Sequence, residues 1–119
     1  MKAVKINAVV NLTNGLTVNS GSCLIIAEAY TDNKNQKDLT IPTQVATLLY
    51  QSKNAYNAGK TPISEIADFK TTMVGSLLVS DYETKKTEQM LLDFIIAQLT
   101  PIYGADKLDI IAVTPKAIV

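Results

Sequence analysis

Alternating apolar and polar residues open the chain. Residues 4–12 are apolar at every second position, which is typical of a strand with one face toward water. The pair Asn14-Gly15 follows, and it tolerates the positive φ angles of a tight hairpin turn. Residues 23–30 are apolar at both alternating sets of positions apart from Glu28, which predicts a more central strand that is covered on both faces.

Two further extended segments follow in the middle of the chain. Residues 39–51 form the first, and Pro42 near its start favours either an edge position or the beginning of a strand, because proline cannot donate to a ladder. Residues 65–78 are rich in threonine and aliphatic side chains and predict another strand. Gly75 inside this segment indicates a bulge or a bend.

Two helices are expected from capping and periodicity. Ser52 and Gly59 are placed to begin and end a short helical turn. A capping box at residues 80–83 precedes a long amphipathic helix over about residues 81–100, which Pro101 is expected to end or kink. Its apolar stripe repeats at spacings of three and four: Leu91, Leu92, Phe94, Ile95, Ile96 and Leu99.

The order of these elements predicts one α+β domain over residues 1–119. We expect a mixed four- or five-stranded sheet with the long helix packed on one face, in the order β-β-β-β-α-β. The last strand is expected over residues 107–114, where both faces are apolar. A strand, a helix and a strand in succession favour a right-handed crossover, so we expect the strands before and after the helix to run parallel.

Composition narrows the chemistry. Eleven lysines balance eleven Asp and Glu, and the chain has no Arg, His or Trp. A balanced charge without arginine argues against contact with nucleic acid. Without histidine the chain lacks the commonest general base and a common metal ligand, so we expect no catalytic residues, no metal and no cofactor. Cys23 lies in an apolar run, and a small buried hydrophobe in a reducing compartment is favoured over a reactive thiol.

Several short motifs resemble binding or catalytic motifs but have simpler interpretations. Residues 58–61, Ala-Gly-Lys-Thr, lack the first glycine of a phosphate-binding loop and precede Pro62 rather than a helix. The pairs Glu65/Asp68 and Asp106/Asp109 could share a face, but solvated carboxylates without a catalytic role are the favoured explanation. A serine–lysine dyad remains formally possible. The N-terminus lacks the apolar core of a signal peptide, and no run is long enough to span a membrane.

One helix can cover only one face of the expected sheet, which bears on whether the chain associates with other molecules. Residues 23–30 and 107–114 are apolar on both faces, yet the pattern predicts only one long helix to cover them. Either a neighbouring molecule covers the second face, or the loop at 31–38 and the turn at 52–59 fold back over it. If a neighbour does so, the side chains that we expect at the interface are Leu48, Tyr50, Tyr56 and Ile118.

Two segments carry a resemblance to a known group of proteins. They are YQSKNAYNAGKTPI at residues 50–63 and AQLTPIYG at residues 97–104. Together with the short β-rich body, they resemble small structural (virion) proteins of tailed bacteriophages of Bacteroidetes hosts. The resemblance implies a non-enzymatic subunit of a head, head-tail connector or tail, which contacts copies of itself as a homo-oligomer and other virion proteins.

Such a subunit would reside in the virion after assembly in the host cytoplasm, without membrane contact. The alternative is a small cytoplasmic protein-binding module or inhibitor, which would be a stable monomer with one aromatic hot spot. An enzyme would need a cleft with convergent carboxylates whose pKa values are raised.

Overall fold

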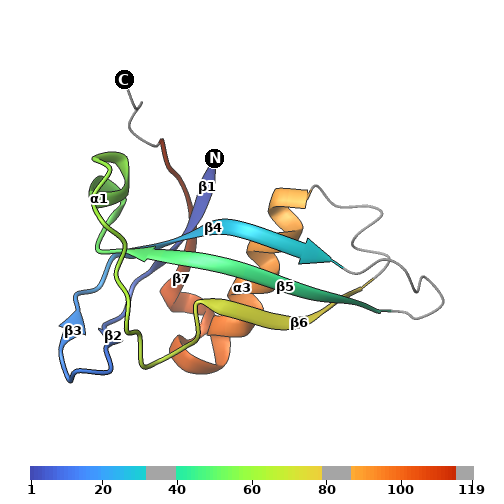
Figure 1. Cartoon of the computed structure of the whole chain (residues 1–119), viewed down its shortest axis with the longest axis horizontal. Helices are drawn as coiled ribbons and strands as arrows, with labels where there is room; N and C mark the ends of the chain where they lie inside the picture. Colours follow the sequence, from blue (N-terminus) through green and yellow to red (C-terminus); the bar gives the residue numbers. More distant parts are fainter. Residues whose placement is uncertain (32–39, 79–86, 115–119) are drawn as a thin grey trace.

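The computed structural model describes residues 1–31, 40–78 and 87–114 (Figure 1). Five strands form one sheet in the order β6-β5-β4-β1-β7, and every neighbouring pair is antiparallel. Helix α3 packs on one face, here called the inner face. The strands of the sheet are β1 (Lys2–Ile6), β4 (Ser22–Thr31), β5 (Thr40–Tyr50), β6 (Thr72–Leu78) and β7 (Leu108–Ala112).

Smaller elements complete the chain. A two-stranded hairpin lies beside the sheet, and a short helix follows β5. These elements are β2 (Val10–Asn11), β3 (Thr17–Val18), α1 (Lys53–Asn57), α3 (Thr87–Tyr103) and the 3-10 turn η1 (Ala105–Lys107). The fold is therefore α+β with one main helix, as expected, but the expected element order left out β2, β3, α1 and η1.

The main core lies between α3 and the inner face. Leu92, Ile95 and Leu99 of α3 are fully buried there. Gly75 lies in the regular ladder opposite Thr43, so the bulge expected at this glycine is absent. A side chain at this position would place its Cβ 2.9 Å from Phe94 and from Gln98, so glycine lets α3 approach β6 closely. The irregular register lies in β4 instead, between Ile26 and Glu28.

Every neighbouring pair in the sheet is antiparallel, so the expectation of a mixed sheet was wrong. β7 pairs antiparallel with β1, with Leu108 opposite Ile6, and β6 lies at the other edge. The chain crosses the whole inner face between these two strands through α3 (Figure 1). β6 and β7 nevertheless run in the same direction, because four antiparallel pairings separate them. The strand, helix and strand in succession thus join two parallel strands, as expected, but three other strands lie between them.

Helix α3 differs from the expected helix at its C-terminal end. The capping box at 80–83 and the first expected turn lie outside the described residues. Pro101 neither ends nor breaks the helix, which continues to Tyr103. Proline here deprives only the carbonyl of Ala97 of its donor, and Ala97 is exposed, so water can satisfy that group. The helix ends at Gly104, whose φ is 90°.

Pro42 lies in β5, which runs between β6 and β4, so β5 is not an edge strand and that alternative was wrong. The other alternative is confirmed, because Pro42 is the third residue of β5. Thr47 N–H donates to the Thr71 carbonyl, so odd-numbered residues of β5 bond toward the β6 side and even-numbered ones toward β4. The described β4–β5 pairing ends at Thr31 and Thr43. The missing N–H of Pro42 therefore falls just beyond the last described pair.

The local turn predictions were confirmed. In the hairpin, Leu12 N–H donates to the Leu16 carbonyl at 2.9 Å, and Gly15 has a φ of 86°. At α1, the Ser52 hydroxyl oxygen accepts a hydrogen bond from Ala55 N–H at 3.1 Å. The strand expected over 4–12 is divided, because β1 ends at Ile6 and β2 begins at Val10.

Candidate functional site

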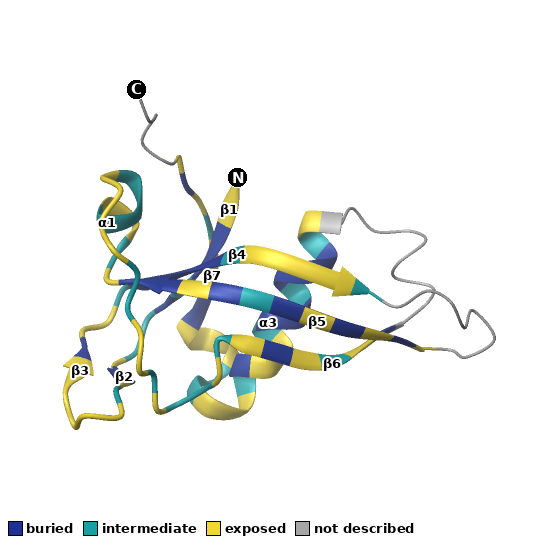
Figure 2. Ribbon diagram, in the orientation of Figure 1, coloured by how far each residue is buried: buried dark blue, intermediate teal, exposed yellow. Residues whose placement is uncertain are grey.

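The face of the sheet opposite α3, here called the outer face, is covered at one end. Five buried residues form a second small core there, with Tyr56 of α1 and Ile111 of β7 packed against it. This closed end consists of Ala3, Cys23, Ile25, Tyr50 and Val113. α1 lies over it, as Figures 1 and 2 show. The turn at 52–59 thus does fold back over the sheet, but it covers only part of the outer face.

Two of the expected interface residues contact each other at the closed end. The rings of Tyr50 and Tyr56 meet edge to face, with centroids 4.9 Å apart. The Tyr56 hydroxyl also donates to the Met1 sulfur at 3.3 Å. Tyr50 is only 9% exposed, so most of its surface is used within the chain. Ile118 lies outside the described residues.

Cys23 is a buried free thiol in the closed end, as predicted. Burial raises its pKa to about 11, and the charge of Lys53 offsets only part of this effect. The thiolate is the reactive form of cysteine, so Cys23 is nearly all neutral thiol at physiological pH. Its environment therefore matches a structural role.

At the other end of the outer face, α1 and the other described residues leave side chains exposed to solvent (Figure 2). The loop at 31–38, the other segment considered as a cover for this face, lies outside the described residues from residue 32 onward. The exposed apolar side chains at this end are Tyr30 at 61%, Leu48 at 39% and Val74 at 69%. Gln44 of β5 is paired with both Tyr30 of β4 and Val74 of β6, so these three residues form a row across three strands. This open end comprises Glu28, Tyr30, Gln44, Ala46, Leu48, Thr72 and Val74.

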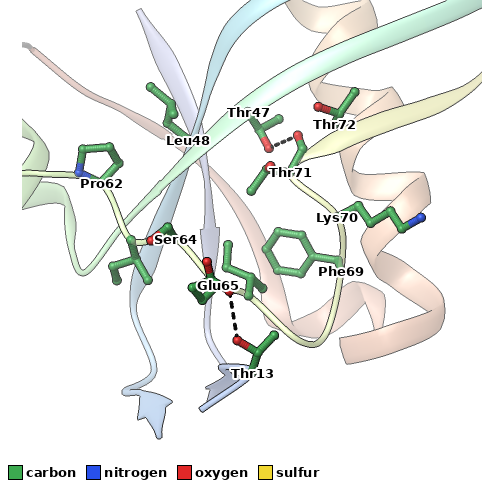
Figure 3. Close-up of a pocket in the computed structure, with 12 residues that line it drawn as sticks. Thr13, Thr47, Leu48, Pro62, Ser64, Glu65, Phe69, Lys70, Thr71 and Thr72 are labelled. Atoms are coloured by element: carbon green, nitrogen blue, oxygen red, sulfur yellow. Dashed lines mark hydrogen bonds between the residues drawn. The ribbon is translucent and has the colours of Figure 1, made fainter. Parts of the chain in front are cut away.

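A hollow of about 500 Å³ adjoins the open end at Leu48 (Figure 3). It forms because residues 64–70 leave the edge of β5 after Ile63 and return to it at Thr71. Glu65 lines this hollow with a φ of 62°, a left-handed conformation that is uncommon for a residue other than glycine.

Hydrogen bonds to the hairpin hold the wall of the hollow. Glu65 accepts two bonds from Thr13, one from N–H to its carbonyl at 2.8 Å and one from the hydroxyl to its carboxylate at 3.2 Å. The carboxylate of Asp68 accepts from the backbone N–H of Asn11 at 2.8 Å and from the Tyr103 hydroxyl at 2.9 Å. These contacts account for the conformation of residues 65–68 without a ligand.

The Asp68 cluster shows how these contacts act on charge. Burial alone would raise the pKa of Asp68, but the hydrogen bonds from Asn11 and Tyr103 outweigh it and lower that pKa below its ordinary value. Burial and the same carboxylate raise the pKa of Tyr103. The cluster therefore holds a charged carboxylate against a neutral phenol, a stable pair that links the hairpin to α3.

The carboxylate pairs considered from the sequence do not converge on a common site. Glu65 and Asp68 each have their own hydrogen-bond donors, and Asp109 accepts from the Asn7 side chain at 2.7 Å. Lys70 also lines the hollow, but its side chain points away from Glu65 (Figure 3). Within residues 1–31, 40–78 and 87–114, no three side chains of the metal-binding types gather in one place.

The Gly59-Lys60-Thr61 segment follows α1 and leads into an irregular connector, whereas a phosphate-binding loop leads directly into a helix.

No helix in the described part of the chain is long and apolar enough to cross a membrane.

The sequence indicated Leu48 but did not single out Tyr30 or Val74. Tyr30 lies in a stretch that the pattern predicts to be covered on both faces, and Val74 lies in a segment rich in threonine and aliphatic residues. Only the strand order shows that α1 does not reach either of them. Tyr30 and Val74 come into one row with Gln44 only because β6 lies beside β5.

Comparison of the chain with protein-family models, with curated proteins and with solved structures gives no match.

Proposed function

We propose that this chain is a non-enzymatic structural subunit of a bacteriophage particle that acts by protein–protein association through the open end of its outer face. The observation that carries the proposal is the contrast in exposure on one face. Cys23 and Tyr50 are buried at the closed end, whereas Tyr30, Leu48 and Val74 remain exposed at the open end. Exposed apolar side chains gathered on one face are typical of contact surfaces.

The resemblance to small virion proteins supports the phage assignment. Its first segment, residues 50–63, comprises the end of β5, α1 and the connector, and its second segment comprises the end of α3 and Gly104. The partners would be copies of the same chain and other subunits of a head, head-tail connector or tail. The protein would assemble in the host cytoplasm and remain in the virion. Balanced charge gives no reason to expect nucleic acid as a partner.

Sedimentation of the purified chain over a range of concentrations tests the proposal. We expect the average mass to rise above that of one chain. Leu48→Asp places a charge in the open end and should require at least about tenfold more protein for the same degree of association. Leu16→Asp is the matched control, because Leu16 is 64% exposed in the hairpin, away from the outer face. It should associate like the unmodified chain.

A strict monomer at the highest concentration, without affinity for other virion subunits, would contradict the proposal. The alternative is a small cytoplasmic binding module or inhibitor, and Tyr30 favours it as an exposed aromatic next to Glu28 and Gln44. In that case the chain stays monomeric, and Tyr30→Ala weakens capture of a host protein.

A further inference from the structure

We propose that two copies of this chain pair along the free edge of β6, antiparallel and about a two-fold axis at Gly75, so that one sheet runs through both copies. The inference rests on the proposed function and names its first partner, a second copy of the chain. It comes from the hydrogen-bonding pattern, the charge and the exposure of the two edge strands.

The backbone of β6 has unpaired groups on its outer side. Thr71 accepts from Thr47 N–H, so the odd-numbered residues of this strand bond to β5 and the even-numbered ones point away from it. In the described part of the chain, no strand pairs with β6 on that side. The N–H and C=O groups of Thr72, Val74 and Ser76 therefore form an edge that fits another extended backbone.

The strand is complementary to itself. β6 runs from Thr72 to Leu78, so antiparallel pairing over its full length places Gly75 opposite Gly75 of the second copy. In this register Val74 and Ser76 are opposite each other in both directions, and both belong to the outward-bonding set. A two-fold axis then satisfies the donors and acceptors of both copies by the same contacts. Gly75 falls where side chains approach most closely, and it has none.

Charge distinguishes this edge from the other one. β6 contains no charged residue, so a second copy meets no like charge along the strand. At the opposite edge, β7 contains Asp109 within the strand. Charged residues precede both strands, Lys70 before β6 and Asp106 and Lys107 before β7, so the difference lies within the strands themselves. Charged side chains are a common means of keeping an edge strand from pairing with another chain. The difference favours β6 as the pairing edge.

Apolar side chains are also exposed beside the β6 edge. A hollow of about 380 Å³ lies between β6 and the last turns of α3, and its lining mixes apolar residues such as Met73, Leu99 and Ile102 with Lys70, Thr72 and Gln98. Val74 is 69% exposed and Ile102 44% exposed, on opposite sides of the strand. A second strand laid along β6 would bring apolar surface to both. It would also join the open ends of the two copies into one larger surface for other subunits.

Cysteine pairs test the register directly. Val74→Cys and Ser76→Cys are made separately, mixed, and exposed to a mild oxidant. Opposed residues in an antiparallel pair have Cα atoms within the range that a disulfide spans. We expect a crosslinked dimer from the mixture and much less from either variant alone. The native Cys23 contributes little background, because it is buried and its pKa is about 11.

Two matched prolines test the edge itself. Val74→Pro removes an N–H that points away from β5, so the ladder inside the monomer stays intact. Ile110→Pro is the matched variant on β7, where Asn7 N–H donates to the Lys107 carbonyl and Val113 N–H to that of Met1, so that even-numbered residues again point outward. We expect Val74→Pro to weaken dimerisation at least tenfold and Ile110→Pro to leave it unchanged, with circular dichroism confirming that both fold. Ser76→Lys gives the same loss through charge if the proline variant does not fold.

The outcomes separate this inference from the proposed function. A chain that associates equally well with Val74→Pro or Ser76→Lys, or that loses association only with Ile110→Pro, overturns pairing at β6. If Leu48→Asp still weakens association in that case, assembly through the open end stands without pairing at β6. Crosslinks from Val74→Cys alone would overturn the axis at Gly75. An unmodified chain that stays monomeric at all concentrations contradicts both.

Discussion

The two ends of the outer face share strands β4 and β5 but have different surroundings. At the closed end, Tyr50 packs against Tyr56 of α1 and is 9% exposed. At the open end, Tyr30 extends from the neighbouring strand and is 61% exposed. The apolar character of a strand therefore does not decide whether it is covered within the chain. The reach of one five-residue helix decides it here, and what that helix leaves exposed is the surface available to partners.

The largest expected difference between the ends is in stability. Tyr50→Ala removes a buried ring and its aromatic contact, and we expect the free energy of unfolding to fall by about 3 kcal/mol. Tyr30→Ala makes the same change at the open end and should alter it by less than about 0.5 kcal/mol. Urea unfolding of both variants measures the difference. Similar losses in the two variants would show that the open end is also covered.

The second difference appears at alkaline pH and comes from Cys23. Its pKa is raised to about 11 in the folded chain from 9.0, so the unfolded chain loses this proton at lower pH. The stability contributed by the neutral thiol is complete below pH 9 and is lost as the pH rises to 11. We expect the stability difference between the unmodified chain and Cys23→Ala to shrink over this window by about 2 kcal/mol.

Unfolding measured for both chains at each pH isolates this effect from tyrosines and lysines that ionise over the same range. Burial also raises the pKa of Tyr56, which makes the comparison with Cys23→Ala necessary. A difference that does not change between pH 9 and 11 would mean that Cys23 is accessible to water in the folded chain.

The smallest effect expected here tests whether α1 keeps the closed end closed. Ser52→Ala removes the hydroxyl that caps this helix and should cost about 1 kcal/mol. If α1 opens more often as a result, Cys23 should react with a thiol reagent about fivefold faster. Ser76→Ala on the outer face is the matched control and should leave the rate unchanged. An unchanged rate in Ser52→Ala would place the protection of Cys23 in β7 and the residues after it.

Local structure followed from the sequence where a few neighbouring residues determine it. Ser52 and Gly59 bound α1, Asn14-Gly15 forms the hairpin turn, and β5 matches the expected segment almost to the residue. These elements depend on caps, turn conformations and alternation, all of which act within a few residues. Burial of Cys23 followed from its apolar neighbours in the same way.

The order of the strands in the sheet could not be predicted from the sequence, because it depends on contacts between distant segments. Pairing of β7 with β1 requires α3 to cross the entire sheet, and no local pattern specifies the length of that crossing. The network that joins Asn11, Asp68 and Tyr103 unites three segments whose own sequences give no sign of contact. An uncovered second face was one of two alternatives that the sequence left open. Of the residues at the open end, Leu48 was expected as a contact, whereas Tyr30 and Val74 were not singled out because their position depends on the same strand order.

The pairing of β7 with β1 also affects synthesis of the protein. β1 is made first, yet one of its edges has no partner until residues 108–112 emerge from the ribosome. Helix α3 also emerges late, so Val4 and Ile6 lack the side chains that bury them for most of synthesis. The sheet can therefore be completed only after nearly all of the described chain has been translated, and until then one edge of its first strand stays exposed in the nascent chain.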